Sequence, residues 1–175
     1  MNNDILKVGM AQIAPIWLNK TETTKKVVDY IVKASKENCD LVTFGEAFIP
    51  GYPFWIELTN GAKFNNKIQK EIHSHYLKNA VCIENGDLDV IKKTCEKNKI
   101  ATIVGCIELG KDRGNHSLYC SLVYINKNGK IKSVHRKLVP TYEERLSWSP
   151  GDGNGLRVHK LGAFTVGGLN CWENW

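Results

Sequence analysis

Short apolar runs alternate with an amphipathic stretch over the first 45 residues. The run Lys7–Ile13 is mostly apolar and is closed by Pro15, a pattern typical of a buried strand. The run 40–44 has the same character and predicts a second strand. Between them, residues 20–37 form a predicted helix, since apolar side chains recur at helical spacing at Val27, Val28, Ile31, Val32 and Ala34. Strand, helix, strand is a βαβ unit, so we expect the two strands to be parallel.

The pattern is less regular in the middle of the chain. Residues 47–60 contain Pro50, Gly51, Pro53 and several aromatic side chains, which predicts an irregular aromatic loop. Helical segments are expected near 63–80 and 87–98, and a third strand over 100–108.

A hairpin and a final strand are predicted in the last third. The apolar runs 118–125 and 131–134 flank Lys127–Lys130, whose Asn-Gly pair favours a type I′ turn. Residues 164–169 form the last expected strand. The predicted architecture is a single α/β domain with a hairpin added to a layer of strands and helices.

Composition excludes several classes of protein. The 175 residues are 42% hydrophobic and 24% charged, and no apolar run is long enough to span a membrane. The net charge is +6, but the lysines are scattered in short pairs with acidic neighbours, which indicates a solvated surface and not a nucleic-acid face. The N-terminus lacks the pattern of a secretory signal. We therefore expect a cytoplasmic protein that binds neither nucleic acid nor membrane.

Six cysteines are present, and only one has suggestive surroundings. They form no C-x-x-C pair and have no histidine at zinc-ligand spacing, so we expect reduced thiols and no metal site. Five read as small buried hydrophobic residues. Cys171 differs because it follows an apolar, Gly-rich segment, as a thiol raised at the end of a strand would.

Three polar residues stand at predicted strand ends, where ligands tend to bind in α/β sheets: Glu46, Lys137 and Cys171. Each alone has an ordinary structural explanation, as a loop cap, a basic turn or a buried thiol. Together they suit addition of sulfur to a C≡N or C=O carbon. A carboxylate can take the thiol proton, and a lysine can stabilise charge on the attacked substrate, with the N–H of Trp172 as a second donor.

Three segments of the chain resemble the motifs of the nitrilase superfamily of carbon-nitrogen hydrolases, in the same order. They are Gly45–Pro53, His135–Arg145 and Leu169–Asn174. The resemblance extends from Val8 to Trp175. Within the superfamily, the Pro-Gly-Tyr-Pro-Phe-Trp loop, the Pro-Thr-Tyr-Glu-Glu-Arg segment and the Cys-Trp-Glu-Asn ending look more like true nitrilases than like amidases or carbamoylases.

The resemblance implies an αββα sandwich, two sheets with outer helices, of which this chain is about the first half. It implies Glu46 as general base, Lys137 as stabilising cation, Cys171 as nucleophile and Glu144 as a second glutamate that positions substrate or lysine. It implies no cofactor and no metal. Three aromatic side chains are expected to line the substrate pocket: Tyr52, Trp55 and Trp172.

The implied reaction is hydrolysis of a nitrile to a carboxylic acid and ammonia, by an enzyme that forms homo-oligomers at full length. Residues 1–175 would be the N-terminal portion of one hydrolase domain, ending just after the nucleophile, with an exposed edge on its last strand. We expect such a chain not to be a competent enzyme by itself. Two alternatives stay open: an inactive truncated remnant or interaction subunit, and an amidase of the same superfamily acting on a small amide.

Overall fold

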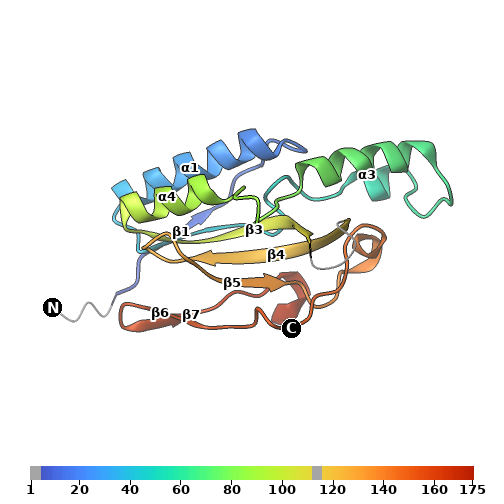
Figure 1. Ribbon diagram of the computed structural model, residues 1–175. Helices are drawn as coiled ribbons and strands as arrows, with labels where there is room; N and C mark the ends of the chain where they lie inside the picture. Colours follow the sequence, from blue (N-terminus) through green and yellow to red (C-terminus); the bar gives the residue numbers. More distant parts are fainter. Residues whose placement is uncertain (1–4, 112–115) are drawn as a thin grey trace.

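One mixed sheet with helices on one face forms the body of the molecule (Figure 1). The computed structural model describes residues 5–111 and 116–175. The sheet has the strand order β1-β2-β3-β4-β5, with strands β1 (Val8–Ala11), β2 (Leu41–Phe44), β3 (Ala101–Gly110), β4 (Ser117–Ile125) and β5 (Ile131–Arg136).

The strand pairing changes from parallel to antiparallel across the sheet. β1 pairs with β2, and β2 with β3, in parallel, which confirms the predicted βαβ unit. β3, β4 and β5 are antiparallel, and β3 pairs with β4 along nearly its whole length. The carboxyl ends of β2 and β5 carry the segments that begin with Gly45 and Lys137.

The helices form a layer over one face of the sheet (Figure 1). α1 (Lys20–Lys36) begins at Asn19, whose side chain accepts a hydrogen bond from the N–H of Glu22 (3.0 Å) as an N-cap does. α3 (Lys67–Asn79) and α4 (Asp89–Asn98) lie close to the ranges expected from the sequence. The aromatic loop also contains a short helix that was not expected, α2 (Trp55–Leu58).

The main core lies between the sheet and helices α1 and α4. Val27 and Ile31 of α1 are fully buried, and they belong to one cluster with Ile91 of α4 and Val104 of β3. The helical periodicity of the sequence therefore marks the face of α1 that meets the sheet.

The hairpin between β4 and β5 exists, but the predicted turn type is wrong. The N–H of Gly129 donates to the carbonyl of Asn126 (2.9 Å), and among the turn residues only Gly129 has a positive φ, of 69°. This is a type I turn followed by a left-handed glycine, whereas type I′ needs positive φ at two central residues. The side chain of Asn126 favours this turn, because it accepts hydrogen bonds from the N–H groups of Asn128 and Lys130 (3.0 Å each).

The last predicted strand is also different. It is shorter, ending at Val166, and β7 (Phe164–Val166) pairs with β6 (His159–Leu161) in a separate two-stranded sheet. This hairpin lies on the opposite side of the main sheet from the helices (Figure 1). Gly162, with φ 61°, makes the tight turn between the two strands. Gly167 and Gly168 follow β7, and glycine disfavours continuation of a strand because it has no side chain to pack against its neighbours.

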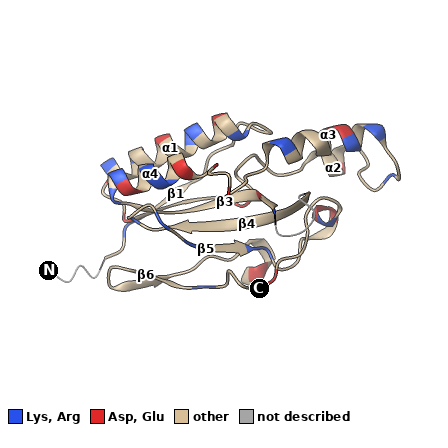
Figure 2. Ribbon diagram, in the orientation of Figure 1, with Lys and Arg blue, Asp and Glu red and all other residues tan. Residues whose placement is uncertain are grey.

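Charged side chains of both signs are mixed along the helices, as Figure 2 shows. Lysines of α1 alternate with Glu22 and Asp29, and Lys25 pairs with Glu22 on the surface (2.6 Å between Nζ and Oε1). The positive net charge is therefore not gathered on the helices as one uniform patch. No helix in the described ranges is long and apolar enough to cross a membrane.

Candidate active site

Two carboxylates from different parts of the chain meet at one buried lysine. Lys137 directly follows β5, and its side chain is only 2% exposed. Its Nζ donates to Oε1 of Glu46 (2.7 Å), the second residue after β2, and to Oε2 of Glu144 (2.8 Å). Glu144 belongs to a 3-10 helix, η1 (Tyr142–Leu146). The fold thus brings together three of the four residues predicted to be catalytic.

Lys137 is held in its charged form by these partners. Burial alone would lower the pKa of Lys137, but hydrogen bonds and charges from Glu144 and Glu46 raise that pKa above its ordinary value. The ammonium also lies 5.7 Å from the centre of the Trp148 ring. The group is therefore a fixed positive charge with little access to bulk water.

Glu144 is fixed from several sides. Its Oε2 accepts the N–H of Thr141 (2.6 Å), at the start of η1, in addition to the lysine. Its Oε1 accepts a hydrogen bond from the hydroxyl of Tyr52 (3.0 Å). Burial and the adjacent charge of Glu144 raise the pKa of Tyr52, so this hydroxyl keeps its proton. With both oxygens occupied, Glu144 is suited to hold the lysine and not to exchange protons.

Glu46 has a less complete set of partners. Its side chain is 22% exposed, and its Oε1 accepts from Lys137 and from the thiol of Cys120, at 3.6 Å from Sγ. No hydrogen bond to Oε2 is found among the described residues. That second oxygen is therefore available to accept a further hydrogen bond.

Gly105 of β3 lets the Glu46 segment lie directly on the sheet. A Cβ added to Gly105 would come within 2.0 Å of the carbonyl oxygen of Gly45 and 3.0 Å of the Cα of Glu46. Only glycine allows two backbones to approach this closely. The position of the carboxylate is therefore set by contact between main chains.

Cys171 begins a second 3-10 helix, η2 (Cys171–Asn174), five residues beyond the end of β7 at Val166, so it does not directly follow a strand as the sequence predicted. The residue is exposed. Of the five cysteines predicted to be buried, Cys82, Cys95, Cys106 and Cys120 are buried, whereas Cys39 is only partly buried. Glu173 of the same helix accepts a hydrogen bond from the N–H of Leu138 (2.8 Å), the residue after Lys137. The turn that carries the cysteine is thus attached to the strand end that carries the lysine.

Three residues at or beside the predicted catalytic groups have left-handed backbone. Ala47 follows Glu46 with φ 52°, Tyr142 begins η1 with φ 43°, and Cys171 itself has φ 48°. Non-glycine residues rarely adopt such angles, and strained backbone concentrates at functional sites. The strained positions therefore coincide with the segments that carry the residues predicted to be catalytic.

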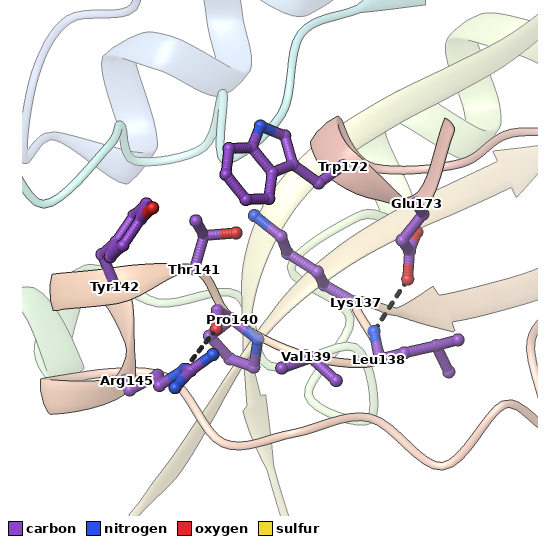
Figure 3. A pocket seen from close by; sticks show the side chains of 9 residues that line it. All are labelled: Lys137, Leu138, Val139, Pro140, Thr141, Tyr142, Arg145, Trp172 and Glu173. Atoms are coloured by element: carbon purple, nitrogen blue, oxygen red, sulfur yellow. Dashed lines mark hydrogen bonds between the residues drawn. The ribbon is translucent and has the colours of Figure 1, made fainter. Parts of the chain in front are cut away.

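A cavity of about 460 Å³ opens between the segment after β5 and η2. Its walls include Lys137, Tyr142 and Trp172, and Figure 3 shows the Lys137 side chain extending between Thr141 and Trp172. The rings of Tyr142 and Trp172 meet edge to face, with 5.8 Å between their centres. A small molecule in this cavity would meet mainly apolar walls, together with the charged residues Lys137, Arg145 and Glu173.

The three aromatic residues expected in the pocket have different positions. Trp172 lines the cavity and is 59% exposed. Tyr52 instead contacts Glu144, as described above. Trp55 is 3% exposed and packs edge to face against Tyr76, with 4.6 Å between ring centres. Its place in a hydrophobic cluster makes Trp55 a residue that supports the α2–α3 region.

Two residues of the site were not identified from the sequence. Cys120 reads as a core residue of an apolar strand, and Trp148 as an isolated aromatic. The hairpin register was a usable signal for Cys120: since Ser121 pairs with Arg136, the next pair along the ladder is Cys120 with Lys137. The N–H of Lys137 does donate to the carbonyl of Cys120 (2.7 Å). Trp148 had no comparable signal.

A metal ion is not what these carboxylates are arranged to bind. In the part of the chain that the structure describes, no group of three or more His, Cys, Asp or Glu side chains could hold one. The space between Glu46 and Glu144 is occupied by the ammonium of Lys137.

Comparison with known proteins gives consistent matches. Residues 7–175 match the carbon-nitrogen hydrolase family. A protein named nitrilase 2, from an unknown prokaryotic organism, is 34% identical over 95% of this chain and 51% of its own length. An arylacetonitrilase from Aspergillus kawachii is 34% identical over 97% of this chain and 48% of its own. An aliphatic nitrilase from Rhodococcus rhodochrous is 32% identical over 96% of this chain and 44% of its own length. The chain therefore spans about half the length of the curated relatives it matches.

Solved structures share the fold. An amidase from Nesterenkonia sp. superposes with a TM-score of 0.70 at 16% identity, covering 96% of this chain and 56% of its own. A carbon-nitrogen hydrolase from Helicobacter pylori G27 gives a TM-score of 0.67 at 19% identity, and the match covers 97% of this chain and 52% of the other. At these identities the likeness concerns the fold alone, and it agrees with the expectation that this chain corresponds to about half of a nitrilase-like domain.

Proposed function

Because the chain belongs to the carbon-nitrogen hydrolase family, we propose that it carries the catalytic residues of a nitrilase. The reaction is hydrolysis of a nitrile to a carboxylic acid and ammonia. The observation that supports this most strongly is the buried Lys137 ammonium, held at 2.7 and 2.8 Å by Glu46 and Glu144 beside the segment that bears Cys171. A cation fixed next to a carboxylate with one free oxygen suits charge development on a nitrogen or oxygen of substrate.

We assign the roles as follows. Cys171 is the nucleophile, since it is exposed and begins a strained turn. Glu46 is the general base, acting through the oxygen that Lys137 does not occupy. Lys137 stabilises negative charge on the attacked group, and Glu144 fixes the lysine. Trp172 and Tyr142 form walls of the substrate cavity.

The reaction proceeds through two covalent intermediates. Glu46 takes the thiol proton, the sulfur of Cys171 bonds to the nitrile carbon, and the nitrogen gains the proton, which gives a thioimidate. Glu46 then takes a proton from water, whose oxygen adds to the same carbon. The C–N bond breaks and ammonia leaves, with a thioester on Cys171. A second water adds to that carbon, the C–S bond breaks, and the acid and the free thiol are released.

A nitrile is favoured over an amide as the substrate by the sequence relatives. Those named above, at 32–34% identity, are nitrilases, whereas the amidase matched by structure is 16% identical. Amide hydrolysis would use the same residues and begin at the carbonyl carbon, without the thioimidate step. We also propose that residues 1–175 form the N-terminal portion of a single hydrolase domain, and that the full-length enzyme forms homo-oligomers.

The test is ammonia release from the full-length protein with nitriles and the matching amides. One aromatic and one aliphatic pair separate the two substrate types. Faster release from nitriles than from the matching amides, together with a covalent adduct on Cys171 in the intact mass, supports the proposal. Release from amides alone replaces nitrilase by amidase. Release from neither substrate contradicts a catalytic role and favours an inactive subunit.

A further inference from the structure

Glu173 has hydrogen-bond partners on both oxygens of its carboxylate. Oε1 accepts the N–H of Leu138 (2.8 Å), a bond drawn in Figure 3. Oε2 accepts the N–H of Asn170 (2.7 Å) and contacts Nε2 of His135 (2.8 Å). The side chains of Glu173 and His135 are 9% and 4% exposed, so this group of contacts is almost closed to solvent.

The two amide donors flank the proposed catalytic residues. Leu138 follows Lys137 directly, and Asn170 precedes Cys171 directly. They lie on segments far apart in the sequence, one leaving β5 and the other leaving β7. One carboxylate therefore joins the main chain beside the cation to the main chain beside the nucleophile.

These contacts are directional and leave little freedom. Hydrogen bonds from neutral N–H groups to a carboxylate are shorter and stronger than those between neutral groups. A local helix cap would need only the contact with Asn170. The contacts with Leu138 and His135 instead cross from η2 to the β5 strand and the segment that follows it.

We propose that Glu173 is a positioning residue that sets the separation of Cys171 from Lys137. The inference rests on the proposed function, because it assigns Cys171 and Lys137 the roles of nucleophile and cation. Glu173 itself does not touch the reacting atoms. It acts through the two backbone segments, and an error of about 1 Å in such a separation can cost roughly 100-fold in rate.

The contact can be tested in the unaltered protein by two-dimensional amide NMR across an acid titration. Protonation of Glu173 weakens both amide hydrogen bonds at once, so the Leu138 and Asn170 signals should move together with one shared midpoint. Midpoints that differ, or signals that do not move while the protein stays folded, would overturn the proposal. This measurement needs no activity, so its result stands whether or not the protein hydrolyses nitriles.

The consequence for catalysis can be tested with Glu173→Gln in the full-length protein. Glutamine offers one acceptor oxygen, and its NH₂ group would face an N–H donor, so one of the two segments must be released. We expect kcat to fall about 100-fold with KM changed less than threefold. Glu96→Gln, on the exposed surface of α4, is the matched control and should leave both constants unchanged.

The results of the two experiments separate this inference from the proposed function. A folded Glu173→Gln variant with wild-type kcat, or with an effect on KM alone, overturns the positioning role. If the wild-type protein releases no ammonia from nitriles or amides, the proposed function fails, and the NMR titration alone decides whether Glu173 links the two segments. If Glu173→Gln does not fold, the titration of the unaltered protein again decides.

Discussion

The Lys137 cluster and the Cys171 turn are neighbouring regions built in opposite ways. Lys137 is 2% exposed, follows a five-stranded sheet and has two carboxylate partners, one of them buried. Cys171 is exposed and starts a four-residue helix that leaves a two-stranded hairpin. The Lys137 side of the site is enclosed by its own fold, whereas the turn that bears Cys171, the proposed nucleophile, is open and is linked to that side through Glu173.

We infer that the first region contributes mainly to stability and that the proposed reactivity belongs to the second. A cation buried between carboxylates costs free energy to desolvate and is stable only while all partners are present. An exposed thiol on a short turn makes few contacts, so its removal costs little stability. Four experiments test this division between the two regions.

The largest effect is expected from Cys171→Ala. Without the sulfur no covalent intermediate can form, so turnover by the full-length enzyme should fall about 10⁵- to 10⁶-fold, as for other catalytic nucleophiles. The free energy of unfolding should change by less than about 0.5 kcal/mol, because the residue is exposed. Ammonia release and urea unfolding measure the two quantities. Retention of more than a thousandth of the activity would remove Cys171 from the nucleophile role.

The next largest effect is expected from Lys137→Met. It leaves Glu46 and Glu144 facing each other without a cation, and breaking a buried pair in this way costs about 3–5 kcal/mol. Lys25→Met is the matched control, since it breaks the exposed pair with Glu22 and should cost less than about 1 kcal/mol. Urea unfolding of both variants gives the comparison, and equal losses would show that the Lys137 cluster contributes no special stability.

A smaller contrast is expected in thiol chemistry. Burial raises the pKa of Cys95 to about 12 and also raises the pKa values of Cys106 and Cys120, so their reactive thiolates are scarce. Iodoacetamide should therefore modify Cys171 in the native protein at least about 100-fold faster than these three. Peptide mass spectrometry over time measures each rate. The fast reaction should be absent in Cys171→Ala, and fast labelling of Cys120 would mean that its surroundings open.

The smallest effect is a pH dependence that belongs to Glu173. Burial would raise its pKa, but hydrogen bonds from Leu138, Asn170 and His135 outweigh it and lower the pKa below the ordinary 4.5. Since the folded protein holds the charged form better, the contribution to stability is present above pH 4.5 and is lost as the pH falls through the folded-state pKa. Unfolding free energies of wild type and Glu173→Gln should therefore converge on acidification. A constant difference between pH 7 and pH 3 would contradict this assignment.

Much of the fold could be predicted from the sequence because its signals are local. The spacing of Val27 and Ile31 marks a helix face, and the short runs that became β2 and β4 are rich in the β-branched and aromatic residues that favour strands. The pairing of Phe164–Val166 could not be predicted, since an isolated apolar run does not indicate its partner strand. The predicted turn type was wrong because the side chain of Asn126, which precedes the Asn-Gly pair, favours a different turn through its hydrogen bonds.

Part of the candidate site could be predicted, because chemically suitable side chains follow predicted strands. Glu46 and Lys137 each follow an apolar run, and the structure brings them together. Glu144 depended on the family resemblance, because nothing local separates it from Glu143. Trp55 packs inward against Tyr76, because an aromatic residue in a loop can pack against the core as readily as it can line a pocket. The structure leaves the substrate role of all three aromatic residues as a prediction.

The close contact between Gly105 and the Gly45–Glu46 backbone has a consequence for how the protein can change. Position 105 contributes no functional group, yet any side chain there would push the Glu46 segment off the sheet. A residue with no functional group of its own thus controls the position of Glu46, because no side chain fits between the two backbones. Its freedom to vary is as restricted as that of the carboxylate it supports, and a survey of tolerated substitutions would rank the two positions together.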